Sequence, residues 1–434
     1  MLEILDWSSL ALAERRAALQ RPAREDPARA LETVREILQR VRREGDAALR
    51  ALTLRFDGAA FGAVSAVELD EAEAALSPEQ KQALDRAIAN VKRFHAPQTP
   101  GSRRVQTSPG VVCEQRVLPI RAVGLYVPAG SAPLPSTAIM LAVPALLAGC
   151  PVRVLCTPPR KDGRADAAVL YVARRCGIGS VFKVGGAQAI AAMAFGTGSI
   201  PKVDKVFGPG NSFVIAAKQL VAGDPEGAAF DLPAGPSEVL IVADDSARAD
   251  FVAADLLAQA EHSPEAQAVL IATSRALAER ACSEVERQCA QLTRRDIVRQ
   301  SLAAARVLAV ETLDAALAVS NEYAPEHLIL HVAEPRRWLE KVTSAGSVFL
   351  GPWSPETMGD YCSGANHVLP TYGYARAWSG LSLHDFTKRI TVQELTAEGL
   401  RDLGPTACTM AGMEGLDAHA NAVRVRLQAV RKLP

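Results

Sequence analysis

The chain has 434 residues, of which 49% are hydrophobic and 22% are charged, with 48 basic and 48 acidic side chains. This length exceeds one ordinary domain core, so we expect two large lobes with smaller appendages. The balanced charge argues against nucleic acid or an anionic membrane as a partner of the whole surface.

Cysteine usage and the N-terminus bear on the cellular compartment. The eight cysteines form no CxxC pair, so the sequence predicts neither a zinc ribbon nor a thioredoxin-type site. The first residues lack the basic start and apolar core of a signal peptide. The longest apolar run, residues 137–149, is too short for a membrane span and contains Pro144. We therefore expect a soluble cytoplasmic protein with reduced thiols.

The N-terminal portion predicts helices. Asp26 followed by Pro27 is typical of an N-cap and first helical residue, and Ser77-Pro78 begins a second helix in the same way. Apolar stripes at helical spacing follow each start, at Val34, Ile37, Leu38 and Val41 and then at Leu84, Ile88 and Val91. We expect the arginine-rich faces of this portion to be solvated.

From about Arg121, short runs rich in β-branched residues alternate with segments of helical periodicity. The predicted strands are 122–127, 152–156, 180–184, 203–207, 238–243, 268–272, 306–310, 328–332 and 347–350. The predicted helices include 165–175, 187–195, 213–222 and 248–261. Such alternation is typical of βαβ units, so we expect an α/β fold with parallel sheets covered by helices. After about Ile390 we expect helices again, with Thr391–Glu394 as a capping box.

Two predicted strand-to-helix turns contain glycines, Gly185-Gly186-Ala187-Gln188 and Gly208-Pro209-Gly210-Asn211. Turns of this kind let backbone N–H groups and a helix N-terminus approach a phosphate closely. Neither turn matches G-x-G-x-x-G, so the dinucleotide fingerprint is absent. Either turn alone is more typical of simple loop chemistry, but the occurrence of both in successive βα units makes a bound nucleotide an equally good interpretation.

Glu326 and His327 are adjacent where a loop broken by Pro325 enters a predicted strand. Imidazole titrates near neutral pH, and the mouth of a strand holds a side chain rigidly. Taken alone, such a pair is more often polar capping of a strand. Other candidate residues elsewhere in the chain make acid–base chemistry the stronger interpretation.

Several polar residues could form a metal or substrate site. Gln259 and His262 are three residues apart at the end of a predicted helix and share one face. Asp360 and His367 lie in a stretch rich in Gly, Ser, Pro and Asn, which is more typical of a site than of a surface turn. Glu414 and His419 lie in the C-terminal helical segment, and the residues alone give little support for a site there.

The motifs taken together resemble one enzyme family. They include Tyr126-Val-Pro, Val184-Gly-Gly-Ala-Gln188 and Tyr323-Ala-Pro-Glu-His327. The full set of matching stretches is 124–136, 184–191, 207–211, 231–238, 259–262, 323–328, 345–351 and 364–370. In this order, and spread over most of the chain, they resemble the histidinol dehydrogenase family. Ala129 replaces a glycine that is common in the family's Tyr-Val-Pro-Gly-Gly turn, which weakens the inference of phosphate binding there.

The resemblance implies an NAD-dependent, four-electron alcohol and aldehyde dehydrogenase of histidine biosynthesis. L-histidinol would be oxidised to L-histidine through L-histidinaldehyde, with two successive hydride transfers to NAD⁺. Glu326 and His327 match the family's catalytic acid–base pair. His327 would take the alcohol proton in the first step, and Glu326 would activate water in the second.

The resemblance also assigns ligands. Gln259, His262, Asp360 and His419 match the family's zinc ligands, with one zinc ion per subunit that positions the substrate. Tyr126, Gln188 and Asn211 match its NAD contacts. The substrate-binding positions comprise Ser237, Gln259, His262, His327, Asp360, His367, Glu414 and His419. From its donor types alone, such a mixed ligand set also accepts cobalt or manganese.

The implied architecture has four parts. We expect an N-terminal helical arm over 1–25 and a catalytic, zinc-binding lobe formed by 26–125 with 237–380. Residues 126–236 would form a Rossmann-like NAD-binding lobe, and residues 381–434 a C-terminal helical tail. The family is a homodimer whose tail crosses to the partner, so Glu414 and His419 would complete the neighbouring subunit's site.

Three other interpretations compete with this one. An aldehyde dehydrogenase-like enzyme would need a nucleophilic cysteine in a Gly-Gln-x-Cys context, which no cysteine here has. A nucleotide-binding regulator that had lost the chemistry would show substitutions at Glu326, His327, His262 or Asp360, and all four are present. A zinc enzyme acting on another amino alcohol stays open, because substrate selection depends on the shape of the pocket.

Overall fold

The computed structural model describes residues 2–21, 27–129 and 133–431. The chain divides into two compact units, Met1–Gln98 with Ile120–Phe386 and Thr99–Pro119 with Thr387–Pro434. The predicted N-cap at Asp26 lies outside the described residues, as do residues 130–132 of the stretch 124–136. No helix in the described ranges is long and apolar enough to cross a membrane.

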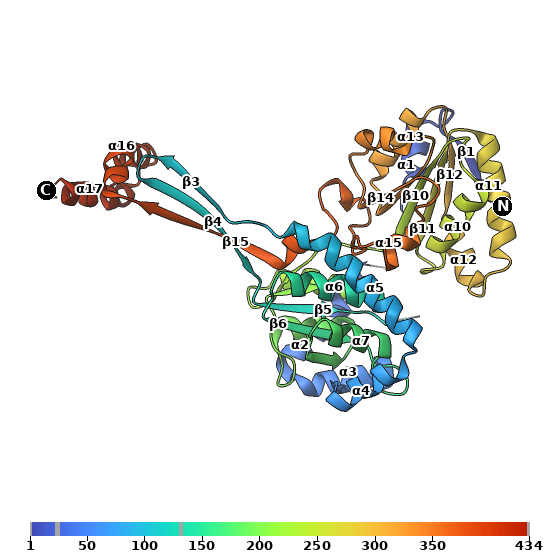
Figure 1. The fold of residues 1–434 in the computed structure, drawn as a ribbon, viewed down its shortest axis with the longest axis horizontal. Coiled ribbons are helices and arrows are strands. Elements are labelled where there is room, and N and C mark those ends of the chain that lie inside the picture. Colours follow the sequence, from blue (N-terminus) through green and yellow to red (C-terminus); the bar gives the residue numbers. More distant parts are fainter. Residues whose placement is uncertain (1, 22–26, 130–132, 432–434) are drawn as a thin grey trace. The chain divides into compact units, whose positions relative to one another are not determined.

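The first unit contains two six-stranded sheets (Figure 1). One has the order β1-β12-β11-β10-β13-β14, and all its neighbouring strands are parallel. Its strands are β1 (Ile4–Asp6), β10 (Glu238–Ala243), β11 (Gln267–Ala272), β12 (Arg306–Ala309), β13 (His327–His331) and β14 (Ser347–Leu350). We call it the β10 sheet, after the strand that begins at Glu238.

The other sheet has the order β2-β7-β6-β5-β8-β9 and is parallel except for the pair formed by β2 and β7. Its strands are β2 (Gly62–Ala63), β5 (Ala122–Tyr126), β6 (Val152–Thr157), β7 (Ser180–Lys183), β8 (Lys205–Phe207) and β9 (Ala229–Phe230). We call it the glycine-turn sheet, because β7 and β8 lead into the two glycine turns.

Fifteen α-helices belong to the described part of the first unit. They are α1 (Leu12–Ala18), α2 (Pro27–Glu44), α3 (Asp46–Asp57), α4 (Ala66–Ala75), α5 (Pro78–His95), α6 (Pro135–Leu147), α7 (Ala167–Arg175), α8 (Gly186–Phe195), α9 (Ser212–Ala222), α10 (Ala249–Ala260), α11 (Arg275–Cys289), α12 (Arg295–Leu302), α13 (Leu313–Tyr323), α14 (Pro335–Trp338) and α15 (Glu356–Tyr361). Short 3₁₀ segments occupy Ala96–Gln98, Leu339–Lys341, Tyr374–Arg376 and Leu383–Phe386.

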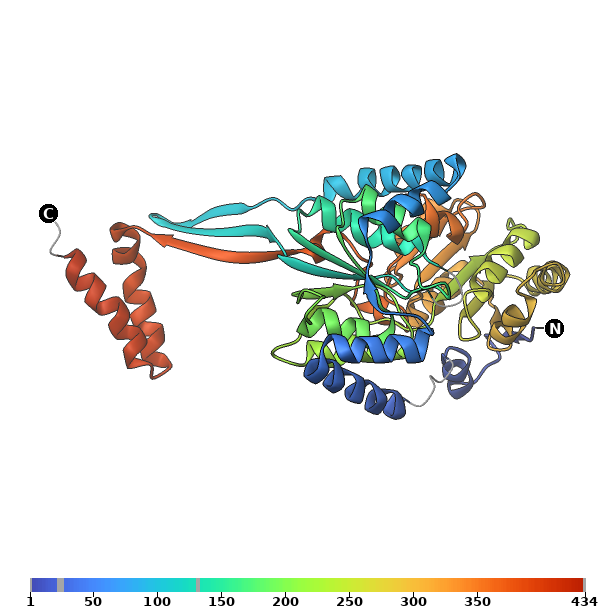
Figure 2. The same ribbon diagram turned by 90° about the horizontal axis from the view of Figure 1, so that it is seen from below.

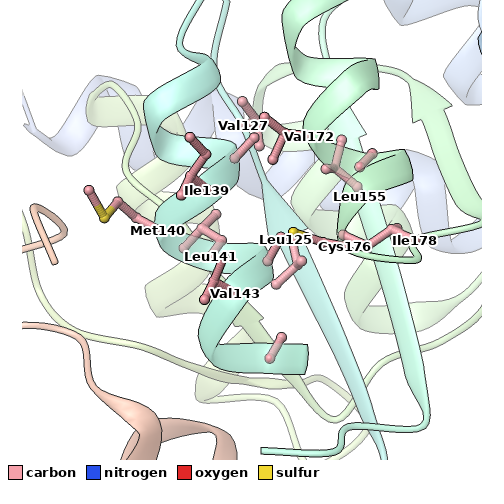
Figure 3. Close-up of a cluster of buried hydrophobic side chains, with 14 of the residues drawn as sticks. Leu125, Val127, Ile139, Met140, Leu141, Val143, Leu155, Val172, Cys176 and Ile178 are labelled. Carbon is pink, nitrogen blue, oxygen red and sulfur yellow. The ribbon is translucent and has the colours of Figure 1, made fainter. Parts of the chain in front are cut away.

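Each sheet of the first unit is covered by helices on both faces, because successive strand residues point to opposite sides. On β5, Val123 and Leu125 face the cluster that contains α6 and α7, whereas Ala122 and Tyr126 face the cluster of α2, α3, α8 and α9. Figure 3 shows side chains of α6, such as Ile139 and Leu141, beside Leu125. Fully burying one such side chain contributes roughly 1.5–3 kcal/mol, so these interfaces dominate the stability of the unit.

The β10 sheet repeats this arrangement. Val239 and Ile241 of β10 face α10, α11 and α12, and Leu240 and Val242 face α1 and α13. The expected α/β fold with parallel, helix-covered sheets is confirmed. The predicted strands 238–243 and 347–350 coincide with β10 and β14, and the others differ from the observed strands by one or two residues at an end.

The expected grouping of residues 26–125 with 237–380 differs from the strand pairing. Strands β2 and β5 belong to the glycine-turn sheet, and α2 packs on α8 and α9 of the same lobe. The physical reason is the stripe of Val34, Leu38 and Val41, which is buried in that cluster. The β10 sheet instead receives β1 from the extreme N-terminus.

The second unit is an antiparallel sheet of three strands with two helices (Figure 2). Its elements are β3 (Arg103–Ser108), β4 (Val111–Pro119), β15 (Thr387–Leu395), α16 (Ala397–Met413) and α17 (Asp417–Val430). The predicted capping box at Thr391–Glu394 is wrong, because these residues pair along β4 in β15. The β-branched run Ile390-Thr391-Val392 favours a strand, and the true N-cap is Thr396, whose hydroxyl accepts from the Gly399 N–H at 3.2 Å.

A buried ion pair supports the turn after β8. Lys218 donates to the Gly208 carbonyl at 2.8 Å and pairs with Asp231, while Asp231 accepts from the Gly208 N–H at 2.7 Å. Gly208 has a φ of +125°, and a Cβ there would lie 2.1 Å from the Tyr126 carbonyl oxygen. Lys218 and Asp231 therefore bind the carbonyl and the N–H of Gly208, at a position where the backbone requires glycine.

Replacing Lys218 with Met should lower the free energy of unfolding by about 3–5 kcal/mol, because it leaves the Asp231 carboxylate buried without its cation. Urea unfolding followed by circular dichroism measures this loss. Lys202, whose ammonium donates to the Glu226 carbonyl at the surface, provides the control, and Lys202→Met should change the value by about 0.5 kcal/mol or less. Equal effects of the two substitutions would contradict a structural role for the buried pair.

Candidate functional site

A cavity of about 1310 Å³ in the first unit is lined by residues associated with both six-stranded sheets. Glu326, His327, His262 and Asp360 line one part of it, and the two glycine turns line another. The cavity is therefore large enough for a dinucleotide and a small substrate together. The sequence-predicted residues Tyr126, Gln188, Asn211, Ser237 and His367 also belong to its lining.

Glu326 precedes β13 and is almost fully buried. Its Oε2 accepts a hydrogen bond from the Ser237 hydroxyl at 2.7 Å and one from the backbone N–H of Glu238 at 2.8 Å. Burial raises the pKa of Glu326 well above its ordinary value, against the lowering effect of these two donors. When ionised in this setting, the carboxylate is a stronger base than an exposed one.

His327 is the first residue of β13, and its Nδ1 lies 3.1 Å from the Glu238 carbonyl oxygen. A carbonyl can only accept, so this contact places the ring proton on Nδ1 and the lone pair on Nε2. Within the described residues Nε2 has no hydrogen-bond partner, and it lies 3.8 Å from Asp360 Oδ1. Burial lowers the pKa of His327 to about 4, so the ring is neutral at pH 7 and able to accept a proton.

Three potential metal donors, His262, Glu356 and Asp360, lie together, and Gln259 is three residues before His262 on the preceding helix. His262 Nε2 is 3.9 Å from Asp360 Oδ2, and ligand atoms of His262, Asp360 and Glu356 all lie within 4.8 Å of one another. Gln259 is fully buried on α10, and neither atom of its amide has a hydrogen-bond partner among the residues described. An unsatisfied buried amide is costly, and a cation that accepts its oxygen as a ligand would remove part of that cost.

Glu356 was not predicted from the sequence. Its carboxylate is buried, neither oxygen has a hydrogen-bond partner in the described ranges, and Oε1 lies 3.5 Å from His327 Nδ1. Burial raises its pKa, and the charge of Asp360 raises it further. The available signal was the spacing of Glu356 and Asp360, which are four residues apart and therefore share one face of α15.

His367 joins the same region through two contacts. Its Nδ1 lies 2.7 Å from the Asp360 carbonyl oxygen, and its Nε2 lies 3.2 Å from the Thr137 hydroxyl. Because the carbonyl accepts, Nδ1 carries the proton and Thr137 donates to Nε2. Burial lowers the pKa of His367, which keeps the ring neutral.

The glycine turns form the other part of the cavity. The Gly186 N–H at the start of α8 donates to the Tyr126 hydroxyl at 3.1 Å, and Asn211 caps α9 by accepting from the Val214 N–H at 3.1 Å. Gln188 is buried in the first turn of α8. Two helix N-termini thus open on one cavity, an arrangement suited to phosphate groups.

The remaining predicted site residues lie in the second unit. Glu414 ends α16 as its C-cap residue, and His419 lies in the first turn of α17. Both side chains are exposed. The cavity therefore brings together the predicted residues of the first unit except Gln259, which is buried three residues before His262, whereas Glu414 and His419 belong to the second unit.

The cysteines are not placed for covalent catalysis. None of the eight is among the cavity-lining residues, all of which are described. Burial raises the pKa of Cys150 to about 11 and that of Cys176 to about 11. These thiols are protonated at neutral pH and are poor nucleophiles.

Comparison with known proteins supports one assignment over the whole chain. The family model for histidinol dehydrogenase matches residues 19–427. Histidinol dehydrogenase from Xanthomonas axonopodis pv. citri is 56% identical over 428 residues, covering 98% of this chain and 99% of that protein. The Vibrio vulnificus (strain YJ016) enzyme is 52% identical over 424 residues, covering 97% of each chain. The crystal structure of histidinol dehydrogenase from Elizabethkingia anophelis has a TM-score of 0.93 at 44% identity, covering 99% of this chain and 98% of that one. The chain belongs to the histidinol dehydrogenase family.

Proposed function

We propose that this enzyme oxidises L-histidinol to L-histidine through L-histidinaldehyde, reducing two NAD⁺ per substrate, in the last steps of histidine biosynthesis. The observation that carries the proposal is the buried pair Glu326–His327, whose bases face a cluster of nitrogen and oxygen donors. An alcohol oxidised twice needs one base for its hydroxyl proton and another for a water molecule. The pair supplies both.

His327 is assigned as the base of the first oxidation. Its Nδ1–H is held by the Glu238 carbonyl, so Nε2 carries the lone pair toward the cavity. The substrate hydroxyl gives its proton to Nε2 as the carbon loses hydride. A neutral ring is required for this, and burial of His327 keeps it neutral.

Glu326 is assigned as the base of the second oxidation. The hydrogen bonds from Ser237 and Glu238 both fall on Oε2, so we assign Oε1 to the attacking water. Glu326 removes a proton from this water as it adds to the aldehyde. His327, having released its first proton to solvent, then deprotonates the resulting hydrate while the second hydride departs to a second NAD⁺.

A divalent metal ion fits the donor cluster, because unpartnered amide and carboxylate atoms are buried around His262 and Asp360. We assign Gln259, His262 and Asp360 of one chain as zinc ligands, with His419 completing the set. Bound zinc would orient the substrate through its imidazole and amino groups. NAD⁺ fits the glycine turns, with Tyr126, Gln188 and Asn211 as contacts, and serves as the hydride acceptor.

We also propose a cytoplasmic homodimer in which the second unit of one chain completes the site of the other. Exposed apolar side chains in this unit support a protein partner: Ile390, Leu395, Met410, Met413, Leu416 and Val425. Glu414 and His419 would then contact the substrate held by Ser237 and His367 of the partner chain. The balanced charge of the chain fits a small-molecule substrate rather than nucleic acid.

The assignment of substrate, cofactor and metal is tested by measuring NADH formation with L-histidinol and NAD⁺. Turnover should cease after chelation, return on addition of zinc, and yield histidine with two NADH per substrate. Cobalt and manganese additions test the metal preference. Absence of turnover by folded, zinc-loaded protein would move the assignment to another amino alcohol or to a regulator.

The roles of the catalytic pair predict different half-reaction profiles. His327→Gln should slow both oxidations by at least about 100-fold, whereas Glu326→Gln should slow the aldehyde step by that factor and spare the alcohol step. Rapid-mixing measurements started from L-histidinol and from L-histidinaldehyde separate the two steps. Equal loss of both steps in Glu326→Gln would remove Glu326 from the role of water activation.

Complementation tests the crossed tail. Truncation after Met413 should abolish activity while the circular dichroism signal of the two sheets persists. His327→Gln and His419→Ala chains, each inactive alone, should regain about a quarter of wild-type activity after subunit exchange, because half the dimers then contain one intact site. Asn421→Ala provides a matched control on α17 and should remain active. Inactive mixtures after verified exchange would show that each tail serves its own chain.

A further inference from the structure

Arg21, at the end of the N-terminal arm, reaches the first residue of β10. Its Nε and Nη2 donate to the two carboxylate oxygens of Glu238, each at 2.7 Å. The Glu238 side chain is 1% exposed and that of Arg21 is 12% exposed. This planar, bidentate pair is the kind of contact that a lysine cannot reproduce.

Glu238 connects this arginine to both catalytic side chains. Its backbone N–H donates to Glu326 Oε2 at 2.8 Å, and its backbone carbonyl lies 3.1 Å from His327 Nδ1. The backbone of Glu238 therefore sets the tautomer of His327 and, together with the Ser237 hydroxyl, orients the Glu326 carboxylate. The side chain of the same residue is fixed by Arg21.

The same pair holds two strained backbone positions. Ala324 and Tyr372 both have a φ of +54°, which non-glycine residues rarely adopt. Arg21 Nη2 lies 3.0 Å from the Tyr323 carbonyl oxygen and 3.4 Å from that of Ala324, and the Tyr372 N–H donates to Glu238 Oε1 at 2.5 Å. The guanidinium also lies 3.9 Å from the centre of the Tyr323 ring. Ala324 is two residues before Glu326, so any relaxation there would move the catalytic carboxylate.

We propose that Arg21 is a positioning residue for the catalytic pair, acting through Glu238 and the strained backbone at Ala324. Its role in catalysis rests on the proposed function, whereas its role in ordering residues 324–331 does not. Arg21 thereby supports the catalytic pair from outside the substrate and cofactor sites, since it touches neither substrate nor cofactor.

The first test compares Arg21→Met with Arg15→Met in the full-length, zinc-loaded enzyme. Arg15 lies on the same arm and contacts the Trp7 carbonyl and ring away from the pair, so its substitution should leave turnover unchanged. Arg21→Met should lower kcat about 100-fold, the effect expected of a displacement of about 1 Å, with KM for histidinol changed less than about threefold. An unchanged kcat in folded Arg21→Met would overturn the proposal.

Chemical rescue distinguishes positioning from general stabilisation. A surface cavity of about 490 Å³, lined in part by Ala17, Gln20 and Arg21, gives a small cation access to the vacated position. Millimolar guanidinium should restore at least about a tenth of wild-type kcat to Arg21→Ala, and methylammonium at equal concentration should not. Equal rescue by both ions, or by neither, would contradict the role of the planar fork.

Arg21→Lys and hydrogen exchange complete the test. Arg21→Lys keeps the charge and the fold but loses the fork, so its kcat should fall at least about tenfold; full activity would overturn the proposal even if Arg21→Met fails to fold. Amide exchange in peptides covering 324–331 and 371–373 should accelerate in Arg21→Lys and not in Arg15→Met. Hydrogen exchange is measured without turnover, so it tests whether Arg21 orders residues 324–331 even if histidinol is not the substrate.

Discussion

The register between β10 and β13 is the constraint on which the site depends. Parallel pairing sets Val239 opposite His327, which brings the peptide groups of Glu238 beside Glu326 and His327. These residues lie at the amino ends of their strands, whereas ligand sites of open α/β sheets ordinarily lie at the carboxyl ends. The glycine turns after β7 and β8 follow the ordinary rule. The cavity therefore lies between the carboxyl ends of β7 and β8 in one sheet and the amino ends of β10 and β13 in the other. The amino end of β10 supplies the Glu238 N–H, which donates to the Glu326 carboxylate.

Burial determines the electrostatics of this region. Glu326, Glu356 and His327 are buried together, and desolvation raises the pKa of both carboxyl groups while it lowers that of the imidazole. Among the described residues, Glu326 Oε2 accepts two hydrogen bonds, whereas neither carboxylate oxygen of Glu356 has a hydrogen-bond partner. A divalent cation beside Asp360 would favour the ionised carboxylates and keep His327 neutral by repelling its proton. The donor cluster is thus matched to a metal ion in charge as well as in ligand type.

Much of the fold follows from sequence pattern, because most strands are short, β-branched and separated by helical periodicity. The prediction failed at β15, where a Thr-x-x-Glu spacing imitates a capping box inside a run that pairs with β4. The backbone partners of Glu326 and His327 could not be predicted, since they are the N–H and the carbonyl of Glu238, which sheet register brings beside them. The role proposed for Arg21 could not be predicted either, because an arginine in a charged helical arm is ordinarily solvated. This one is buried against a carboxylate 217 residues away.

The second unit buries little apolar surface within itself. Its described residues include four buried hydrophobic side chains, Val111, Ala411, Ala420 and Val430. Eight of the nine residues of β15 are exposed, and a small sheet without a covered face is marginal in water. A segment of this composition is stabilised when its apolar surface meets another protein surface. Placing Glu414 and His419 on such a segment would couple completion of the active site to assembly, because the subunit contact that stabilises the fold would also deliver the last ligands.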